Sequence, residues 1–94
     1  MTIKYTRTTL EKLVVIFEEV GYRVRFEKGN FQSGYCLVQS KKIAVVNKFF
    51  ETKGRISVLL DILSNIKFEP SQLSEKSISF LNSIGMMYLV GELV

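Results

Sequence analysis

The 94-residue sequence contains no histidine and only one cysteine, Cys36. Histidine is the commonest general base and a frequent metal ligand, so its absence excludes most zinc sites and the His-assisted forms of nucleophilic catalysis. A lone cysteine cannot form an internal disulfide, which favours a reducing compartment. We therefore expect a cytoplasmic, non-enzymatic protein with no metal and no cofactor.

Proline and glycine are also scarce, with one and six residues. Together with 47% hydrophobic and 23% charged residues, this composition is typical of a folded domain rather than a disordered tail or a repeat array. The apolar runs are far shorter than the ~20 residues needed to cross a bilayer, and the N-terminal region lacks the unbroken apolar run of a signal peptide. We expect residues 1–94 to form a single globular domain without a membrane span.

Apolar residues recur at helical spacing in three segments. The first follows Thr8 or Thr9, either of which can act as the N-cap, and ends at Gly21. The other two are predicted over residues 51–65 and 73–83. The residues expected on the inner faces of the three helices are Leu10, Leu13, Val14, Phe17 and Val20, then Ile56, Leu59, Leu60 and Leu63, then Ile78, Leu81 and Ile84.

Three strands are predicted between the first two helices. Residues 22–27 alternate apolar and charged side chains, which indicates a half-buried strand with a charged outer face. Residues 34–38 form the second strand, and residues 43–46 form a third that is apolar on both faces. The predicted fold class is α+β, in the order α-β-β-β-α-α, with the strands in an antiparallel three-stranded meander. Because the third strand should be covered on both sides or flanked by another strand, we expect residues 86–90 to add a fourth beside it.

The middle of the chain carries a specific pattern, Gly-Asn-Phe-Gln-Ser-Gly-Tyr-Cys over residues 29–36, then an apolar strand, Val-Asn-Lys-Phe-Phe over 46–50 and Gly-Arg-Ile over 54–56. Over residues 22–63 this pattern resembles a small uncharacterised bacterial protein family, a resemblance that implies no activity. Residues 30–33 are interpreted as closing a hairpin, since glycine and asparagine supply positive φ angles.

The order of elements over residues 8–64 also resembles the front half of small zinc metallopeptidases, in which the helix after the strands carries His-Glu-x-x-His. Leu60, Asp61 and Ser64 stand at the ligand and general-base positions of that motif. Leu60 cannot ligate zinc and Ser64 is a poor ligand, so this activity is rejected. Cys36 is interpreted as a buried structural residue rather than a nucleophile, because it has no histidine to activate it.

Lysine and arginine outnumber aspartate and glutamate by 13 to 9, a net charge of +4 that suits an acidic partner but lacks the dense clusters of dedicated nucleic-acid binders. A candidate basic patch consists of Arg23, Arg25, Lys41, Lys42 and Lys48. Aromatic residues lie among these cations, as in proteins that bind single strands by stacking. Weak nucleic-acid binding is therefore the alternative function, although Glu27 and Glu51 interrupt the patch and a solvated charged face is the simpler interpretation.

A candidate partner surface consists of Phe49, Phe50, Met86, Met87 and Tyr88. Two consecutive phenylalanines cannot both face one side of a strand, so we expect one ring to be exposed. Exposed apolar patches mark interfaces, which favours a protein-interaction domain that binds a protein partner or a second copy of the chain. The alternative is that both rings and the C-terminal segment complete the core. The carboxylates at Glu27, Glu51, Asp61 and Glu92 are too widely spaced in the sequence to identify a catalytic pair.

Overall fold

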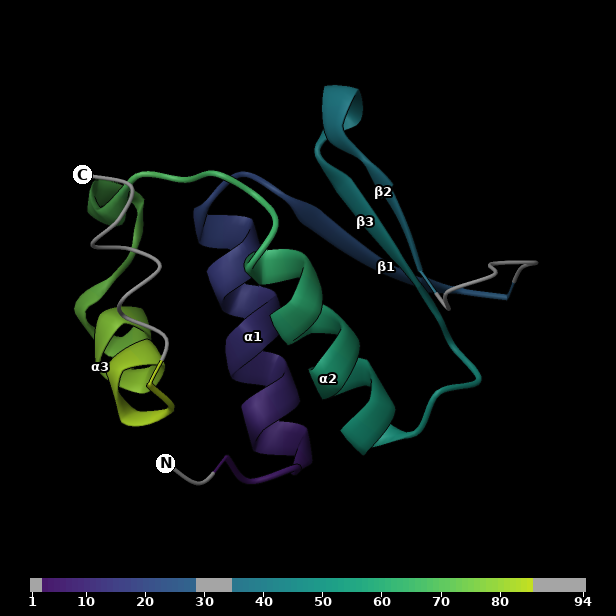
Figure 1. Cartoon of the computed structure of the whole chain (residues 1–94), viewed down its shortest axis with the longest axis horizontal. Helices are drawn as coiled ribbons and strands as arrows, with labels where there is room; N and C mark the ends of the chain where they lie inside the picture. Colours follow the sequence, from purple (N-terminus) through teal and green to yellow (C-terminus); the bar gives the residue numbers. More distant parts are fainter. Residues whose placement is uncertain (1–2, 29–34, 86–94) are drawn as a thin grey trace.

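The computed structural model describes residues 3–28 and 35–85 (Figure 1). Over these ranges the chain has an α+β fold with the helices α1 (Arg7–Glu19), α2 (Thr52–Leu63) and α3 (Glu75–Ser83). The strands are β1 (Arg23–Glu27), β2 (Tyr35–Val38) and β3 (Ile43–Asn47), and short 3-10 turns cover Gln39–Lys41 and Pro70–Gln72. Helices α1 and α2 pack against each other beside the sheet, and α3 packs on the side of α1 away from the sheet.

The strands form a mixed sheet in the order β1-β3-β2, with β3 at its centre. β1 runs parallel to β3, with Arg23 opposite Ile43, and β2 runs antiparallel to β3, with Val38 opposite Ile43. The predicted antiparallel three-stranded meander is therefore wrong. A meander would pair β1 with β2, whereas β1 pairs in parallel with β3.

The connections between the strands account for this order. β2 and β3 are joined by residues 39–42 alone, a link short enough for antiparallel neighbours but too short for a parallel crossover. Residues 28–34 separate β1 from β2, and the chain places these two strands on opposite edges of β3. The central position suits β3 because it is apolar on both faces, and an edge suits the charged β1.

The predicted fourth strand, residues 86–90, lies outside the described residues. Among the described strands, β1 takes one edge of β3 and β2 takes the other.

Helix α1 begins two or three residues earlier than predicted, because its N-cap is Thr6 and not Thr8 or Thr9. The backbone of Thr6 is extended, and its hydroxyl accepts a hydrogen bond from the backbone N–H of Thr9 at 3.3 Å. The hydroxyl of Thr6 also donates to the hydroxyl of Thr9 at 3.2 Å, so the buried Thr9 is a partner of the cap within the first turn. The helix ends before Gly21, whose φ of 88° is the left-handed conformation that glycine adopts readily.

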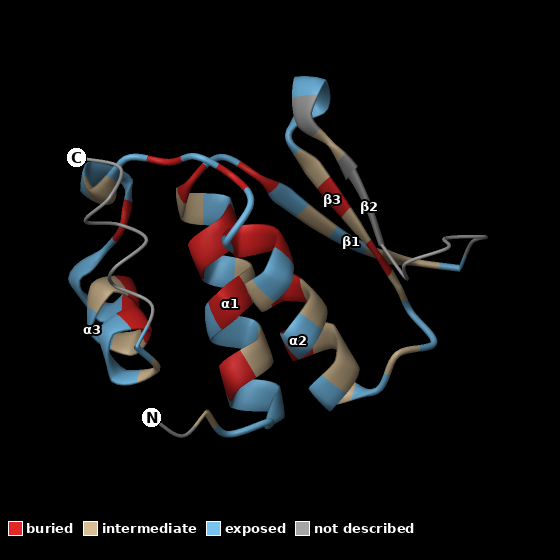
Figure 2. Ribbon diagram, in the orientation of Figure 1, coloured by how far each residue is buried: buried red, intermediate tan, exposed pale blue. Residues whose placement is uncertain are grey.

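The core lies where α1, α2 and the facing side of the sheet meet, and Figure 2 shows buried residues concentrated there. Most of the predicted inner-face residues are buried, but Leu10, Val14, Leu60, Ile78 and Ile84 are only partly buried. Ile16 and Ile62, which were not predicted, are fully buried because α1 and α2 each pack against more than one neighbour.

The two faces of the sheet differ in what covers them. Ala44 and Val46 of β3 are fully buried on the side of the helices. The alternate residues Ile43 and Val45 are half-buried on the opposite face, where no helix of the described residues lies. The register places the exposed Arg23 and Arg25 of β1 beside them on this open face.

Helix α3 is attached to α1 through Glu19. The carboxylate of Glu19 accepts a hydrogen bond from the backbone N–H of Ser74, the N-cap of α3, at 3.2 Å. Burial acts to raise the pKa of Glu19, but hydrogen bonds from Ser77 and Ser74 outweigh it and hold this pKa below its usual value of 4.5. The ionised carboxylate therefore stabilises the start of α3.

We expect the contribution of Glu19 to stability to be present at neutral pH and to disappear in acid. Since its pKa is lower in the folded than in the unfolded chain, this contribution is complete above pH 4.5 and is lost as the pH falls through the folded-state pKa. Glu19→Gln should reduce the free energy of unfolding by about 0.5 kcal/mol at pH 7 and by less at pH 3. Urea titrations at both pH values check this, with Glu18→Gln as the control. An unchanged difference at pH 3 would contradict the assigned role.

Candidate partner surface

The turn between β3 and α2 is built around Asn47, the last residue of β3. The Asn47 Oδ1 atom accepts a hydrogen bond from the backbone N–H of Phe49 at 3.0 Å. The Asn47 carbonyl accepts one from the backbone N–H of Phe50 at 3.2 Å. Asparagine side chains commonly bond the backbone two residues ahead in this way, so the turn follows from the residue that ends the strand.

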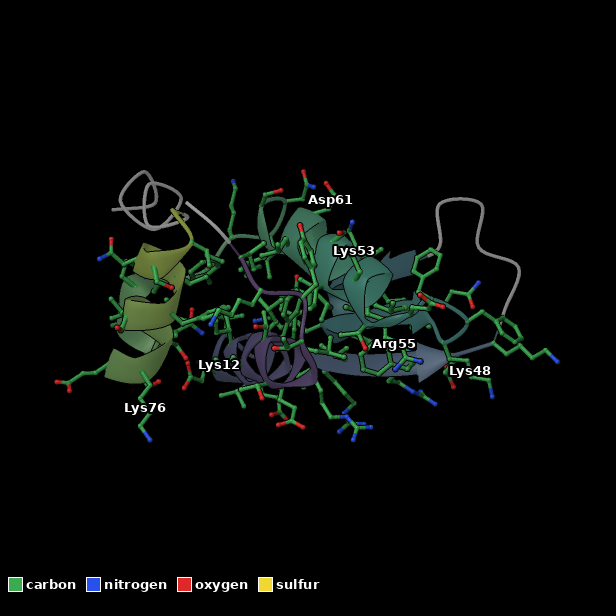
Figure 3. All side chains as sticks on the ribbon, turned by 90° about the horizontal axis from the view of Figure 1, so that it is seen from below. Lys12, Lys48, Lys53, Arg55, Asp61 and Lys76 are labelled. Carbon is green, nitrogen blue, oxygen red and sulfur yellow. The ribbon has the colours of Figure 1, made fainter. Side chains whose placement is uncertain are left out.

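Arg55, in the first turns of α2, holds the other side of this turn. Its Nε atom donates to the carbonyl of Phe50 at 2.8 Å, and its Nη2 atom donates to the carbonyl of Lys48 at 2.7 Å. The guanidinium carbon lies 4.8 Å from the ring centroid of Phe26 on β1. Figure 3 shows Arg55 pointing from α2 toward the turn that carries Lys48. One arginine thus connects the turn, α2 and β1.

This turn places the two phenylalanines in different environments. Phe50 is half-buried against the core and lies over Gly54, where an added Cβ atom would approach the Phe50 Cβ to 3.3 Å. Phe49 is 66% exposed, the highest value among the large exposed hydrophobic residues of the described ranges. The Nζ atom of Lys28 lies 5.6 Å from the Phe49 ring centroid, so a cation accompanies the exposed ring. A fixed turn therefore presents one aromatic side chain to solvent.

The residues of the candidate partner surface are only partly described. Phe49 and Phe50 are neighbours in the turn, one exposed and one half-buried. Met86, Met87 and Tyr88 lie outside the described residues. The side chain of Cys36 is not described either, so its expected burial stays a prediction.

The five residues of the candidate basic patch fall in three places on the sheet. Arg23, Lys41 and Lys42 lie where β1 and β3 begin, and the backbone N–H of Arg23 donates to the Lys42 carbonyl at 2.9 Å. Lys48 follows the other end of β3, about 20 Å away at ~3.3 Å per residue. Arg25 lies between them and is bonded to Glu27 at 2.8 Å. The sheet therefore separates these cations into two groups with an ion pair between them.

Metal-binding clusters and surface hollows are the remaining features of the described residues that bear on a site. No cluster of three or more histidine, cysteine, aspartate or glutamate side chains that could hold a metal ion occurs in residues 3–28 and 35–85. A surface hollow lies between α1 and α3, where Lys12 crosses to the Phe80 ring with its Nζ atom 5.5 Å from the centroid. Glu19 also lines this hollow, but its carboxylate is engaged by Ser74 and Ser77.

Arg55 is the residue that sequence reasoning missed. It stands in the Gly-Arg-Ile segment that follows the two phenylalanines, but its partners are backbone carbonyls and a ring on another strand. The available signal was an arginine in the first turns of a helix, close to the chain reversal that precedes it. That signal indicates a hydrogen-bond donor near the turn without identifying which carbonyls it binds.

Comparison of the chain with models of known protein families, with curated protein sequences and with solved structures found no match. Within the described ranges, no helix is both long and apolar enough to pass through a membrane. The resemblances noted from the sequence therefore assign no function.

Proposed function

We propose that this protein is a non-enzymatic cytoplasmic interaction domain that binds a protein partner through Phe49. The observation that carries the proposal is the 66% exposure of Phe49 on a turn fixed by Asn47 and Arg55. Aromatic side chains are frequent anchors of protein interfaces. An anchor that is already held in place loses little conformational entropy on binding, which favours affinity.

The surroundings of Phe49 indicate the kind of partner surface that it fits. Lys28 lies over the ring, and the exposed Lys48 precedes it in the chain. An apolar pocket with an acidic rim would accept the ring and pair with both ammonium groups. Phe49 and its two lysines form one small, defined feature, whereas the residues of the candidate basic patch are divided along the sheet. A protein partner is therefore favoured over nucleic acid.

Replacing Phe49 with alanine should remove partner binding without destabilising the protein. The ring is exposed, so we expect the free energy of unfolding to change by no more than about 0.5 kcal/mol. The measurement is capture from a lysate of the source organism by tagged wild-type and variant proteins, with and without nuclease, followed by quantitative mass spectrometry. A protein captured by the wild type in the presence of nuclease should be reduced at least about tenfold with Phe49→Ala, the loss expected when an anchor worth more than 1.4 kcal/mol is truncated.

The matched control is Tyr5→Ala. Tyr5 is also an exposed aromatic residue, at 43%, and the Nζ atom of Lys53 lies 5.4 Å from its ring centroid. Tyr5→Ala should retain the captured protein. Equal loss with both variants, or retention by Phe49→Ala, would contradict the proposal. Material that disappears with nuclease would instead favour nucleic-acid binding.

A further inference from the structure

The outer edge of β1 has the properties of a strand that pairs with another chain. β1 is an edge strand of the sheet, and among the described residues no strand pairs with its other side. The backbone N–H of Arg23 donates to the Lys42 carbonyl, and the Glu27 carbonyl accepts from the backbone N–H of Lys48. Because alternate residues of a strand bond to the same neighbour, Arg23, Arg25 and Glu27 face β3. The backbone groups of Val24 and Phe26 therefore face outward.

The side chains of β1 alternate between charged and apolar, and the charged ones include both signs. Arg23, Arg25 and Glu27 lie on the open face of the sheet, whereas Val24 and Phe26 lie on the side of the helices and are partly buried. Charged side chains on an edge strand usually oppose pairing with other molecules. Here the charges at the two ends of the strand, Arg23 and Glu27, are opposite in sign, so each meets its opposite when a second copy runs in the opposite direction.

We propose that two copies of this chain pair antiparallel through β1, so that their sheets join in the order β2-β3-β1-β1-β3-β2. Among the registers that pair outward-facing residues, the one that places Val24 of one copy opposite Phe26 of the other uses the outward backbone groups of both residues within β1, and we infer this register. In that register residue 23 of each copy lies opposite residue 27 of the other, and residue 25 lies opposite itself. Arg23 then meets Glu27 across the interface, in the type of pair whose side chains approach most closely.

The central pair brings two Arg25 side chains together, and the ion pairs around it offset their repulsion. Arg25 is bonded to Glu27 of its own strand at 2.8 Å. In the joined sheet each Glu27 carboxylate lies between Arg25 of its own copy and Arg23 of the other. Opposite-charge pairs therefore flank the central arginine pair on both sides of the two-fold axis.

Helix α1 adds an apolar surface on the same side as Val24 and Phe26. Val15 is 46% exposed, and Leu10 and Val14 are only partly buried. With Phe26 they border a shallow hollow beside β1, which is lined by Arg7, Leu10, Glu11, Val14, Val15 and Phe26. A two-fold axis perpendicular to the joined sheet leaves both α1 helices on one side of it, so the hollows of the two copies face each other. The second copy thus covers apolar surface that one copy leaves exposed.

Cysteine cross-linking tests both the dimer and its register. In a Cys36→Ser background, Arg25→Cys should form a covalent dimer on mild oxidation, since residue 25 faces itself within disulfide distance. The matched control, Arg23→Cys, lies on the same strand face, but its two copies would be about 14 Å apart at ~3.4 Å per residue. It should stay monomeric on a denaturing gel. Equal cross-linking by both variants, or none by Arg25→Cys, would overturn the proposed pairing.

Charge exchange provides a second test that does not depend on a disulfide. Arg23→Glu and Glu27→Arg each place like charges opposite one another, and each should weaken the dimer by about 10- to 100-fold in sedimentation experiments. An equimolar mixture of the two variants restores both opposite-charge pairs and should recover the wild-type mass. Circular dichroism verifies that both variants are folded, and the double variant Arg23→Glu/Glu27→Arg should dimerise with itself.

A wild-type protein that remains monomeric at every concentration would overturn the inference, as would variants that all remain dimeric. The proposal is independent of the partner bound through Phe49. Phe49→Ala should dimerise like the wild type, and the charge variants should keep the ring exposed, so the two proposals can fail separately.

Discussion

Val46→Asp should severely destabilise the protein, whereas Val45→Asp should cost it little. Val46 is 0% exposed and points from the central strand β3 toward the helices. A carboxylate at this position would be buried without a partner, which costs about 4 kcal/mol or more. Since a domain of this size is stabilised by roughly 5–14 kcal/mol in total, this loss removes about a third of its stability or more. Far-UV circular dichroism and urea titration measure the effect.

Val45 is the matched control because it is the next residue of the same strand. It is half-buried on the open face of the sheet, so a carboxylate there remains in contact with water and lies near Arg23 and Arg25. We expect Val45→Asp to cost about 1 kcal/mol, mainly through lower strand propensity and lost contacts. Equal destabilisation by the two variants would show that both faces of β3 are covered, contrary to the structure.

The helices could be predicted from the sequence because their apolar spacing is an intrinsic signal. Leu13 and Phe17 in α1 and Leu59 and Leu63 in α2 are buried as the spacing indicated. The exact start of α1 was harder to predict from the sequence, because three threonines within four positions can each act as an N-cap. Only the backbone conformation of Thr6 shows which of them does so.

The order of the strands could not be predicted for a different reason. Residues 35–38 and 43–46 are both short apolar runs, and composition does not decide which of them takes the central position. The apolar character of residues 43–46 on both faces did indicate that this strand needs neighbours. It did not indicate that β1, which β2 separates from β3 in the chain, would be one of these neighbours and would run parallel to β3. Strand pairing depends on which distant segments meet, and alternation of side chains carries no such information.

The candidate site was predictable only in outline. Consecutive Phe49 and Phe50 indicated that one ring would be exposed, but the choice between them depends on Asn47, Arg55 and Gly54 acting together. The basic residues show the same limit. Lys42 and Lys48 are close in sequence, but an entire strand separates them in space.

Arg55→Met should destabilise the protein by about 2–3 kcal/mol and release the turn that presents Phe49. Methionine fills a similar volume but cannot donate to the carbonyls of Lys48 and Phe50, which a charged donor now binds at 2.7 and 2.8 Å. Each hydrogen bond from a charged group is worth about 1.5–3 kcal/mol, reduced here because the outer one is exposed to water. The contact with the Phe26 ring is lost as well. Urea titration measures the change in stability.

Two further variants separate the contribution of the Arg55 hydrogen bonds from that of its positive charge. Arg55→Lys keeps the positive charge, but a single ammonium group cannot reproduce the planar fork that reaches two carbonyls and a ring, so it should recover less than half of the lost stability. Lys53→Met removes a charge from the same helix at an exposed position, where it loses only the contact with Tyr5, and should cost no more than about 0.5 kcal/mol. If Arg55→Lys were as stable as the wild type, charge alone would explain the role of this residue.

If the two hydrogen bonds from Arg55 hold the turn, Arg55→Met should also weaken capture of the partner bound through Phe49, even under conditions in which the variant is fully folded. The position of an exposed ring would then depend on an arginine that does not itself contact the partner.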